Sequence, residues 1–282
     1  MKNIIFKYEG ILCVLLSAIL FSIGGLLIKM STWSAISING MRSLFAAAVM
    51  FLIMRKSGHK IIWNKYVFAG AVVTMIVNTT FVIATKMTSA GNAIVLQFTQ
   101  PIFIILFTWL FYKKRPSKEA AITCVVVFLG IVCFFFDSIT FSGMIGNMFA
   151  LTSGISYALV FMMKSIKKLD FESSVMFSFV LGFIVSLPFF AQETSYSYEN
   201  WILVMLLGVF QMGIPFLILG RGLKLVSPIT ASLTSTIEPI LNPVLVAVFY
   251  HEMLGSLAIL GGVIVICAST IYNVRIASRD KG

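Results

Sequence analysis

The chain has 282 residues, of which 59% are hydrophobic and only 11% are charged. Its mean hydropathy of +1.01 excludes an ordinary soluble domain of this size and indicates a protein that lies in a lipid bilayer. The formal net charge of +11 is large enough for a nucleic-acid-binding protein, so the distribution of the basic residues must decide what this charge means.

Ten apolar runs follow one another along the chain, each close to the roughly 20 residues that a membrane-spanning helix needs. Residues 125–136 are apolar on every side, whereas the strands of a membrane barrel would alternate between apolar and polar residues. We therefore predict an all-α integral membrane protein with ten transmembrane helices. The predicted helices comprise residues 10–29, 36–54, 66–85, 89–112, 119–136, 143–163, 172–190, 201–220, 228–250 and 255–274.

The basic residues gather on one side of this predicted topology. If both termini are cytoplasmic, 18 of the 21 Lys and Arg fall in the terminal segments and the cytoplasmic loops. The positive-inside rule predicts this asymmetry for a multi-pass protein of the plasma membrane, which in a bacterium is the inner membrane. The charge therefore reflects topology, and we expect the lipid bilayer, but no nucleic acid, as a partner.

Cysteines and histidines give no sign of catalysis. Cys13, Cys124, Cys133 and Cys267 lie separately within apolar runs, without the close pairing of metal or redox sites. The two histidines fall in or beside loops, where they provide no base for a nucleophile. We predict no enzymatic activity, no metal and no cofactor.

The two halves of the chain, residues 1–137 and 138–282, repeat one pattern. A shift of 138 residues matches Ser89 with Ser227, Pro101 with Pro239, and the pair Phe-Tyr at 111–112 with the same pair at 249–250. Each half has five predicted helices, an odd number, so the second half enters the membrane in the opposite direction. The pattern predicts two inverted five-helix repeats, as in many secondary transporters, with a site near the membrane midplane.

Three segments carry a family resemblance: GMRSLFAAAVMF at 40–51, QPIFIILFTWLFYKKRPS at 100–117 and EPILNPVLVAVFYHEMLGS at 238–256. In these the sequence resembles the EamA-type ten-helix carriers of the drug/metabolite transporter superfamily. The family pattern places an acidic residue at both helix corners; Glu252 keeps it and Lys114 departs from it. The resemblance implies export of amino acids or related metabolites.

The ninth predicted helix carries the first functional candidate. A carboxylate at membrane depth is costly, so Glu238 should have a partner or a function. Thr230, Thr234, Glu238 and Asn242 follow at intervals of four, which predicts one polar face. Pro239 removes a backbone donor and predicts a discontinuous helix, a recognised way to build a midplane site. Glu238 is expected to contact a substrate cation, accept a proton, or pair structurally across the bundle with Arg42.

Further candidates lie on other helices, each with a structural alternative. Arg42 can bind a substrate carboxylate, or it can snorkel or pair structurally. Gln97 and Gln100 lie just before Pro101 and repeat the arrangement around Glu238 and Pro239. An amide within a membrane span can belong to a binding site, or it can only form a hydrogen bond with a neighbouring helix. An aromatic ring can line the path of a cationic ligand, or it can belong to the hydrophobic core. The remaining candidates are Asn78, Gln211, Tyr157 and Phe21.

We interpret the sequence as a secondary transporter that moves a small polar or amphipathic metabolite across the plasma membrane by alternating access. No ATP-binding loop is present in the sequence, so a gradient of protons or another coupling ion, or exchange, is expected to drive it. It is expected to act as a monomer or homodimer. The alternatives are an uptake or exchange carrier for a small amine or quaternary cation, and a channel, which a single glutamate in a pseudo-twofold fold suits less well.

Overall fold

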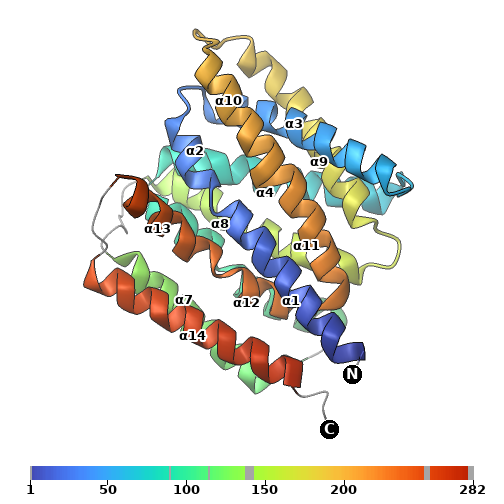
Figure 1. The fold of residues 1–282 in the computed structure, drawn as a ribbon, viewed down its shortest axis with the longest axis vertical. Coiled ribbons are helices and arrows are strands. Elements are labelled where there is room, and N and C mark those ends of the chain that lie inside the picture. Colours follow the sequence, from blue (N-terminus) through green and yellow to red (C-terminus); the bar gives the residue numbers. More distant parts are fainter. Residues whose placement is uncertain (1, 89, 114, 137–142, 251–254, 279–282) are drawn as a thin grey trace.

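The computed structural model describes residues 2–88, 90–113, 115–136, 143–250 and 255–278, and all secondary structure in these ranges is helical (Figure 1). The first group of helices is α1 (Lys2–Phe21), α2 (Gly24–Met30), α3 (Ala35–Lys56), α4 (Lys65–Met87), α5 (Ala90–Gln97), α6 (Gln100–Tyr112) and α7 (Lys118–Phe134). The second group is α8 (Met144–Met162) with the short helix η2 (Met163–Ser165), α9 (Phe171–Phe190), α10 (Tyr198–Leu206), the π-helical segment η3 (Leu207–Gly213), α11 (Ile214–Leu225), α12 (Pro228–Ser235), α13 (Glu238–Tyr250) and α14 (Ser256–Ser278).

The predicted all-α class is confirmed, and each of the ten predicted runs coincides with a helix or with helices in series. Eight described segments are long and apolar enough to cross a membrane. The other two runs are α7, which has 17 residues, and the pair α12 and α13, which is interrupted in its middle. The chain is thus a multi-pass membrane protein.

Breaks divide several of the spans near their middle, for reasons visible in the sequence. Pro101 and Pro239 have no backbone N–H, so the carbonyls of Gln97 and Ser235 lose their helical donors. The chain turns at Phe98–Thr99 between α5 and α6, and at Thr236–Ile237 between α12 and α13. The two broken helices meet there, because the Gln100 side-chain nitrogen donates to the Ser235 hydroxyl at 3.3 Å.

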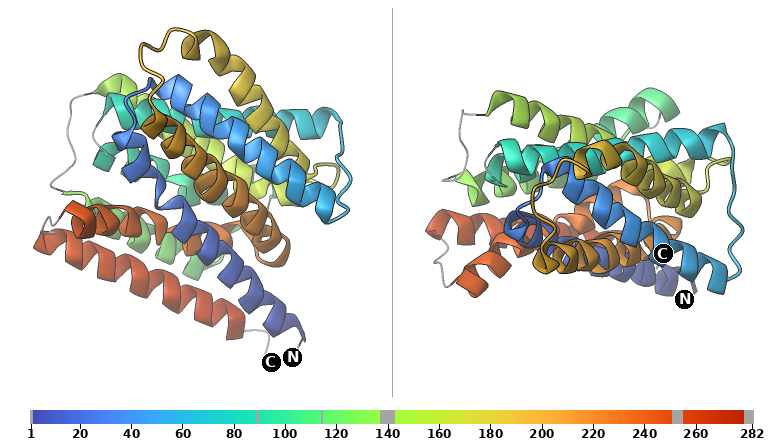
Figure 2. Two further views of the ribbon diagram at one scale, coloured as in Figure 1. Left: turned by 45° about the horizontal axis from the view of Figure 1, so that its top comes forward. Right: turned by 90° about the horizontal axis from the view of Figure 1, so that it is seen from above.

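Helix packing joins the two halves of the chain throughout. The most extensively packed pairs are α4 with α8, α3 with α9, α7 with α14, α1 with α11 and α4 with α9, and each pair takes one helix from each half. Figure 2 shows these helices running side by side in a layered bundle. Small residues permit close approach: a Cβ on Gly130 of α7 would lie 2.8 Å from Val265 of α14, and one on Gly222 of α11 would lie 2.7 Å from Val14 of α1.

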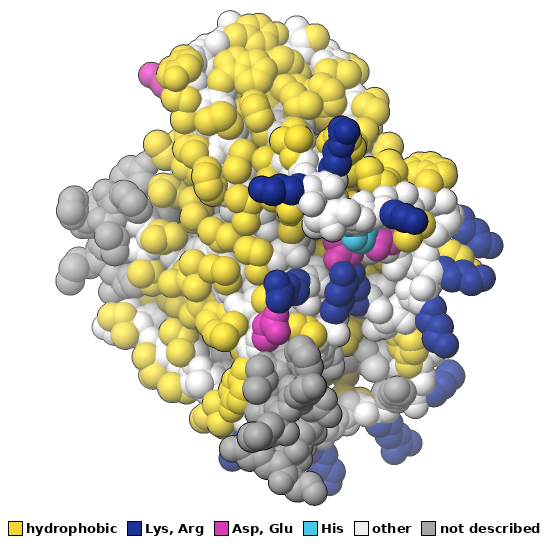
Figure 3. All heavy atoms as spheres, turned by 45° about the vertical axis from the view of Figure 1, so that its right-hand side comes forward, with side chains coloured by type: hydrophobic (Ala, Val, Ile, Leu, Met, Phe, Trp, Pro, Cys, Tyr) yellow, Lys and Arg dark blue, Asp and Glu magenta, His cyan; other side chains and the backbone are white. Residues whose placement is uncertain are grey.

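Charge is concentrated at one end of the bundle. In Figure 3 the Lys and Arg side chains gather around this end, whereas broad hydrophobic surface covers the rest of the visible face. The start of α1 and the end of α14 lie at the same end (Figure 1), which we call the terminal end. A polar end next to an apolar girdle is the arrangement expected of a chain inserted in a bilayer.

Candidate functional site

A small cavity of about 30 Å³, the central cavity, lies where the broken helices meet other helices from both halves of the chain. Its volume is enough for about one water molecule. Seven of the ten residues predicted from the sequence line it, although they come from seven different helical segments: Phe21, Arg42, Asn78, Gln97, Tyr157, Gln211 and Glu238. The remaining lining residues are Val77, Phe81, Met212 and Phe216.

Arg42 is held by neutral groups rather than by a carboxylate. Its Nη1 donates to the Gln211 side-chain oxygen at 3.2 Å, and its Nη2 donates to the Asn39 side-chain oxygen at 3.1 Å and to the Asn78 carbonyl at 3.3 Å. The side chain is 1% exposed, and its Nε is buried without a partner. The expectation that Arg42 snorkels to the membrane surface is therefore wrong, because the guanidinium is fixed inside the bundle with one donor unused.

Glu238 also reaches the cavity without a protein partner. It is the first residue of α13, where the helix dipole favours a negative charge. Its Oε2 is buried without a hydrogen bond, and within the described part of the chain Glu238 forms no ion pair. The structural pairing of Glu238 with Arg42 that the sequence left open is not formed, although both side chains line the same cavity.

Two amides from α4 and α5 line the cavity beside these groups. Gln97 donates from Nε2 to the Ser153 hydroxyl at 2.8 Å, and this hydroxyl donates to the Val77 carbonyl at 3.2 Å. The side-chain nitrogen of Asn78 is buried without a partner. A third unpaired polar atom, an amide donor, therefore joins the Arg42 donor and the Glu238 acceptor.

Aromatic rings form the apolar part of the wall. Phe21 and Phe216 meet edge to face with ring centroids 5.0 Å apart, and Tyr157 packs on Phe161 at 4.9 Å. Phe81 completes this group from α4. The cavity thus combines aromatic faces with two free donors and a free acceptor, a combination that suits an amphipathic ligand.

Three of the predicted residues lie outside the central cavity. Gln100 is fully buried at the crossing of the broken helices, and Asn242 packs tightly against Gly25. Thr234 donates to the Thr230 carbonyl at 2.7 Å and bonds Asn273 of α14 at 3.2 Å. The continuous polar face predicted for the ninth helix is not formed, because the turn at 236–237 separates Thr234 from Glu238.

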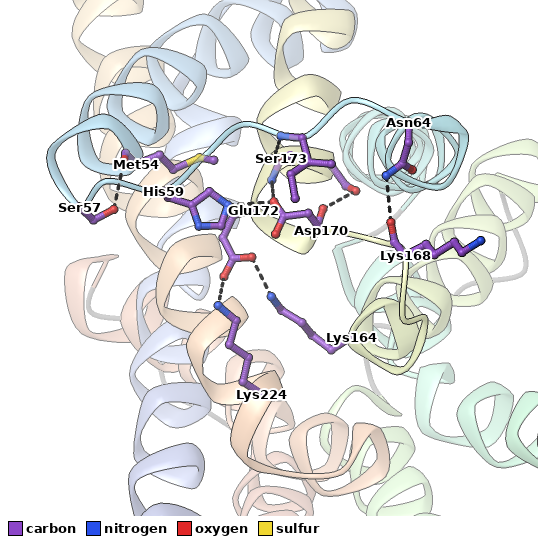
Figure 4. Close-up of polar contacts among 12 residues, drawn as sticks. Met54, Ser57, His59, Asn64, Lys164, Lys168, Asp170, Glu172, Ser173 and Lys224 are labelled. Carbon is purple, nitrogen blue, oxygen red and sulfur yellow. Dashed lines mark hydrogen bonds and ion pairs between the residues drawn. The ribbon is translucent and has the colours of Figure 1, made fainter.

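A charged cluster, the terminal-end cluster, joins three helices and a loop at the terminal end (Figure 4). Glu172 of α9 accepts from Lys164 at 2.7 Å and from Lys224 at 2.8 Å. His59, after α3, lies 3.0 Å from Asp170. Burial acts to raise the pKa of the Asp170 carboxyl, but the hydrogen bonds from Ser173 and the contact with His59 outweigh burial and hold this pKa below its usual range.

The ligand atoms of His59, Asp170 and Glu172 lie within 4.8 Å of one another, as in a metal site. The two lysines on Glu172 already neutralise this group, however, so the charge that would attract a cation is balanced by the protein itself. We assign the cluster to closing the terminal end of the bundle.

Hydrogen bonds close the opposite end. The Asn200 side-chain oxygen accepts from the Ser31 hydroxyl at 2.8 Å and from the Thr32 backbone at 3.1 Å. Glu193 accepts from the Ser34 backbone at 2.9 Å. Burial acts to raise the pKa of Glu193, but hydrogen bonds from Ser37 and Ser34 hold it below its usual range. These contacts fasten the segment between α2 and α3 to α10 and its preceding loop.

The sequence of this chain matches the EamA-like transporter family over residues 8–136 and again over residues 144–274. The chain belongs to the EamA-like transporter family. This EamA-like transporter is 23% identical over 279 residues to an uncharacterized transporter of Archaeoglobus fulgidus, with 96% of this chain and 97% of the relative covered. It is 28% identical over 200 residues to solute carrier family 35 member G1 of Homo sapiens, with 63% of this chain and 54% of the human protein covered.

A solved structure, described only as the crystal structure of a protein, matches this EamA-like chain with a TM-score of 0.83 at 14% identity, covering 97% of this chain and 99% of that one. At this identity the likeness shows the fold alone. The predicted family is confirmed, and with it the prediction of a membrane transporter rather than an enzyme.

The sequence prediction missed the terminal-end cluster and part of the cavity wall. The lysines of the cytoplasmic loops predict only topology, although Asp170 and Glu172 follow Lys168 by two and four residues. Phe81 lies three residues after Asn78, on the same helix face, and Met212 follows Gln211. Helical spacing from the predicted polar residues would have identified Phe81.

Proposed function

We propose that this EamA-like chain is a secondary transporter for a small zwitterionic metabolite, an amino acid or a close relative. The observation that carries the proposal is the pair of unused polar atoms on one cavity, the Arg42 Nε donor and the Glu238 Oε2 acceptor. An amino acid presents a carboxylate to the first and an ammonium group to the second. Burying either protein group without such a partner costs free energy, so a ligand of this kind offsets an existing cost.

The aromatic rings around the cavity support an amphipathic substrate. Phe21, Phe216 and Phe81 provide an apolar wall that a side chain of the substrate contacts. The cavity of about 30 Å³ is smaller than a bound amino acid requires, so the helices around it must separate when substrate binds. Substrate binding and conformational change are then coupled.

Alternating access follows from the two inverted halves, residues 1–137 and 138–282. Two observations support the two halves: the family matches the chain twice, over residues 8–136 and 144–274, and the most extensively packed helix pairs take one helix from each half. Contacts close both ends in the present arrangement: the terminal-end cluster at one, and the bonds of Asn200 and Glu193 at the other. Transport opens these two ends in turn.

The proposed setting is the plasma membrane, with both termini in the cytoplasm and export as the direction of transport. The support for the orientation is the gathering of Lys and Arg at the terminal end. Glu238 couples transport to a proton or binds the substrate ammonium group directly. Pro239 and the turn before it leave this carboxylate at a helix start, where small movements change its surroundings.

A small amine or quaternary cation is the second candidate, favoured by the aromatic rings and Glu238. Such a ligand brings no carboxylate, so the Arg42 Nε would stay unpaired. The two candidates therefore differ in one measurable respect, the need for Arg42.

The test begins with thermal unfolding of the purified protein in the presence of the twenty amino acids, choline, nucleosides and sugars, because a ligand of the folded state raises its apparent stability. The stabilising compound is then followed by counterflow in proteoliposomes. Arg42→Gln and Glu238→Gln should each abolish counterflow, whereas the exposed controls Arg55→Gln and Glu199→Gln should retain it. Counterflow of an amino acid at the wild-type rate in both cavity variants contradicts the proposal, and stabilisation by choline alone replaces it with the second candidate.

A further inference from the structure

A second cavity, the lateral pocket, lies between α1, α12 and α14. It has a volume of about 210 Å³, several times that of the central cavity. It is lined by Tyr8, Ile11, Leu15, Thr234, Ile237, Ile266, Ser269, Thr270, Asn273 and Val274.

The lateral pocket is elongated along the helices. Its lining extends from Tyr8 to Leu15 on α1 and from Ile266 to Val274 on α14, about 10–12 Å at the helical rise per residue. Tyr8 and Val274 lie toward the start of α1 and the end of α14, so one end of the pocket points to the terminal end of the bundle. Its other end, at Ile237, reaches the break between α12 and α13 in the middle of the span.

The break brings the two cavities next to each other. Ile237 lines the lateral pocket, and the next residue, Glu238, lines the central cavity. Backbone bonds resume only beyond this point, where the Leu241 N–H donates to the Ile237 carbonyl at 2.9 Å. The wall between the cavities therefore includes a non-helical turn, which changes its backbone angles more easily than a continuous helix.

The lateral pocket is mostly apolar, but a polar strip of α14 runs along it within the membrane-spanning part of the chain. Asn273 follows Ser269 by four residues and Thr270 by three, so it shares a face of α14 with each of them, and it bonds Thr234 at 3.2 Å. Residues on other faces of α14 are apolar and exposed, including Leu260 and Ile271. A lipid chain cannot form hydrogen bonds with this polar strip, whereas water and amphipathic solutes can.

We infer that the lateral pocket is a second ligand site of this transporter: a vestibule that takes an amino acid with an apolar side chain from the terminal end before it reaches the central cavity. The polar strip of α14 bonds the charged groups of the solute, and Ile11, Leu15 and Ile266 contact its side chain. No charged side chain is among the lining residues, so binding here is weaker than in the central cavity. This inference rests on the proposed function, because it assumes the same substrate.

The first test asks whether the pocket is wet. In a chain whose four native cysteines are replaced by alanine, single cysteines are placed at Thr270 and Asn273 in the pocket, and at Leu260 and Ile271 on the apolar surface. Modification by a membrane-impermeant anionic methanethiosulfonate should be about tenfold faster at the pocket positions, because the thiolate forms only where water reaches it. Equal rates at all four positions, as for a lipid-filled cleft, overturn the inference. This test is independent of whether the substrate is an amino acid.

The second test asks whether the pocket binds the proposed substrate by itself. A mixture of the twenty amino acids should slow modification of the Asn273→Cys variant, and should still slow it when Glu238→Gln removes a charged group of the central cavity. Protection that disappears with Glu238→Gln shows binding at the central cavity alone and overturns the inference. Protection that persists supports a separate site even if Glu238→Gln abolishes counterflow.

Discussion

The Arg42 guanidinium donates a hydrogen bond of 3.2 Å to the side-chain oxygen of Gln211, which lies 169 residues later in the chain. Arg42 comes from α3 and Gln211 from the π-helical segment η3, so this bond joins the two halves at the central cavity. Gly24 fixes the other side of Gln211, because a Cβ there would lie 2.7 Å from the amide nitrogen. The orientation of Arg42, and with it the position of its free donor, therefore depends on Gln211.

Replacing Gln211 by alanine should destabilise the protein and weaken substrate binding together. The change leaves a second donor of a buried arginine unpaired, which costs about 1–3 kcal/mol. Thermal unfolding in detergent measures the stability, and ligand-induced stabilisation measures the binding. Gln192→Ala provides the control, because Gln192 is exposed in a loop. Equal unfolding temperatures of the two variants would contradict this role for Gln211.

Removing the charge of Glu172 should destabilise the terminal end of the bundle. The Glu172 side chain is 9% exposed and its carboxylate bonds Lys164 and Lys224, so Glu172→Gln leaves two neighbouring ammonium groups without their counter-charge. We expect a loss of about 2 kcal/mol, less than for a fully buried pair because Lys224 is 52% exposed. Thermal unfolding of Glu172→Gln is compared with that of Glu199→Gln, whose carboxylate is exposed. If Glu172→Gln lowers the unfolding temperature no more than Glu199→Gln does, the terminal-end cluster contributes no stability.

Asp170 should make the stability of the protein depend on acid pH. Its pKa is held below the usual value, despite burial, by hydrogen bonds from Ser173 and by His59, so the ionised carboxyl stabilises the fold above the pKa of the unfolded chain, near pH 4. This contribution is lost as the pH falls through the folded-state pKa. Asp170→Asn keeps a capping side chain on α9 but removes the charge.

The measurement for Asp170 is the unfolding temperature between pH 7 and pH 3. The variant should be less stable than the wild type at neutral pH, and the difference should shrink as the pH falls from about 4, near the pKa of the unfolded chain, toward the lower pKa of Asp170 in the folded protein. A difference that stays constant over this range would mean that the charge of Asp170 does not contribute. Glu199→Gln, at an exposed carboxylate, serves as the comparison.

Hydropathy predicts the positions of the helices, and proline positions predict two of their breaks. Each apolar run became a helix because the bilayer leaves the backbone no other way to satisfy its hydrogen bonds. Pro101 and Pro239 located two interruptions, because each removes one donor from a known carbonyl. The π-helical segment η3 was not predicted, since Pro215 indicates only that the Gln211 carbonyl is released and not how the chain accommodates it.

Polar residues within apolar spans predict which side chains line the central cavity, but they do not predict the hydrogen-bond partners of these side chains. Arg42, Asn78 and Glu238 reach one cavity because each is costly to expose to lipid. Thr234 shares the helical spacing of Glu238, yet it bonds Asn273 from the far end of the chain. Spacing along one helix predicts a shared face only as long as the helix is continuous, and contacts such as Arg42 with Gln211 depend on packing between distant segments.

The break between α5 and α6 should depend on the absence of a side chain at Gly154 of α8. A Cβ there would lie 2.7 Å from the Leu96 carbonyl oxygen and 2.8 Å from that of Gln97, and both belong to backbone next to the break. Backbone cannot move aside as a flexible side chain does, so Gly154→Ala should push α5 away from α8 and shift Gln97 out of the central cavity. Overpacking of this kind costs about 1–3 kcal/mol. Gly182→Ala is the matched control, because the nearest atom to its Cβ is the Ser43 hydroxyl at 3.3 Å. The unfolding temperature and the counterflow rate should both fall in Gly154→Ala and stay close to the wild-type values in Gly182→Ala. The opposite order would mean that contact between α5 and α8 at Gly154 does not position the cavity.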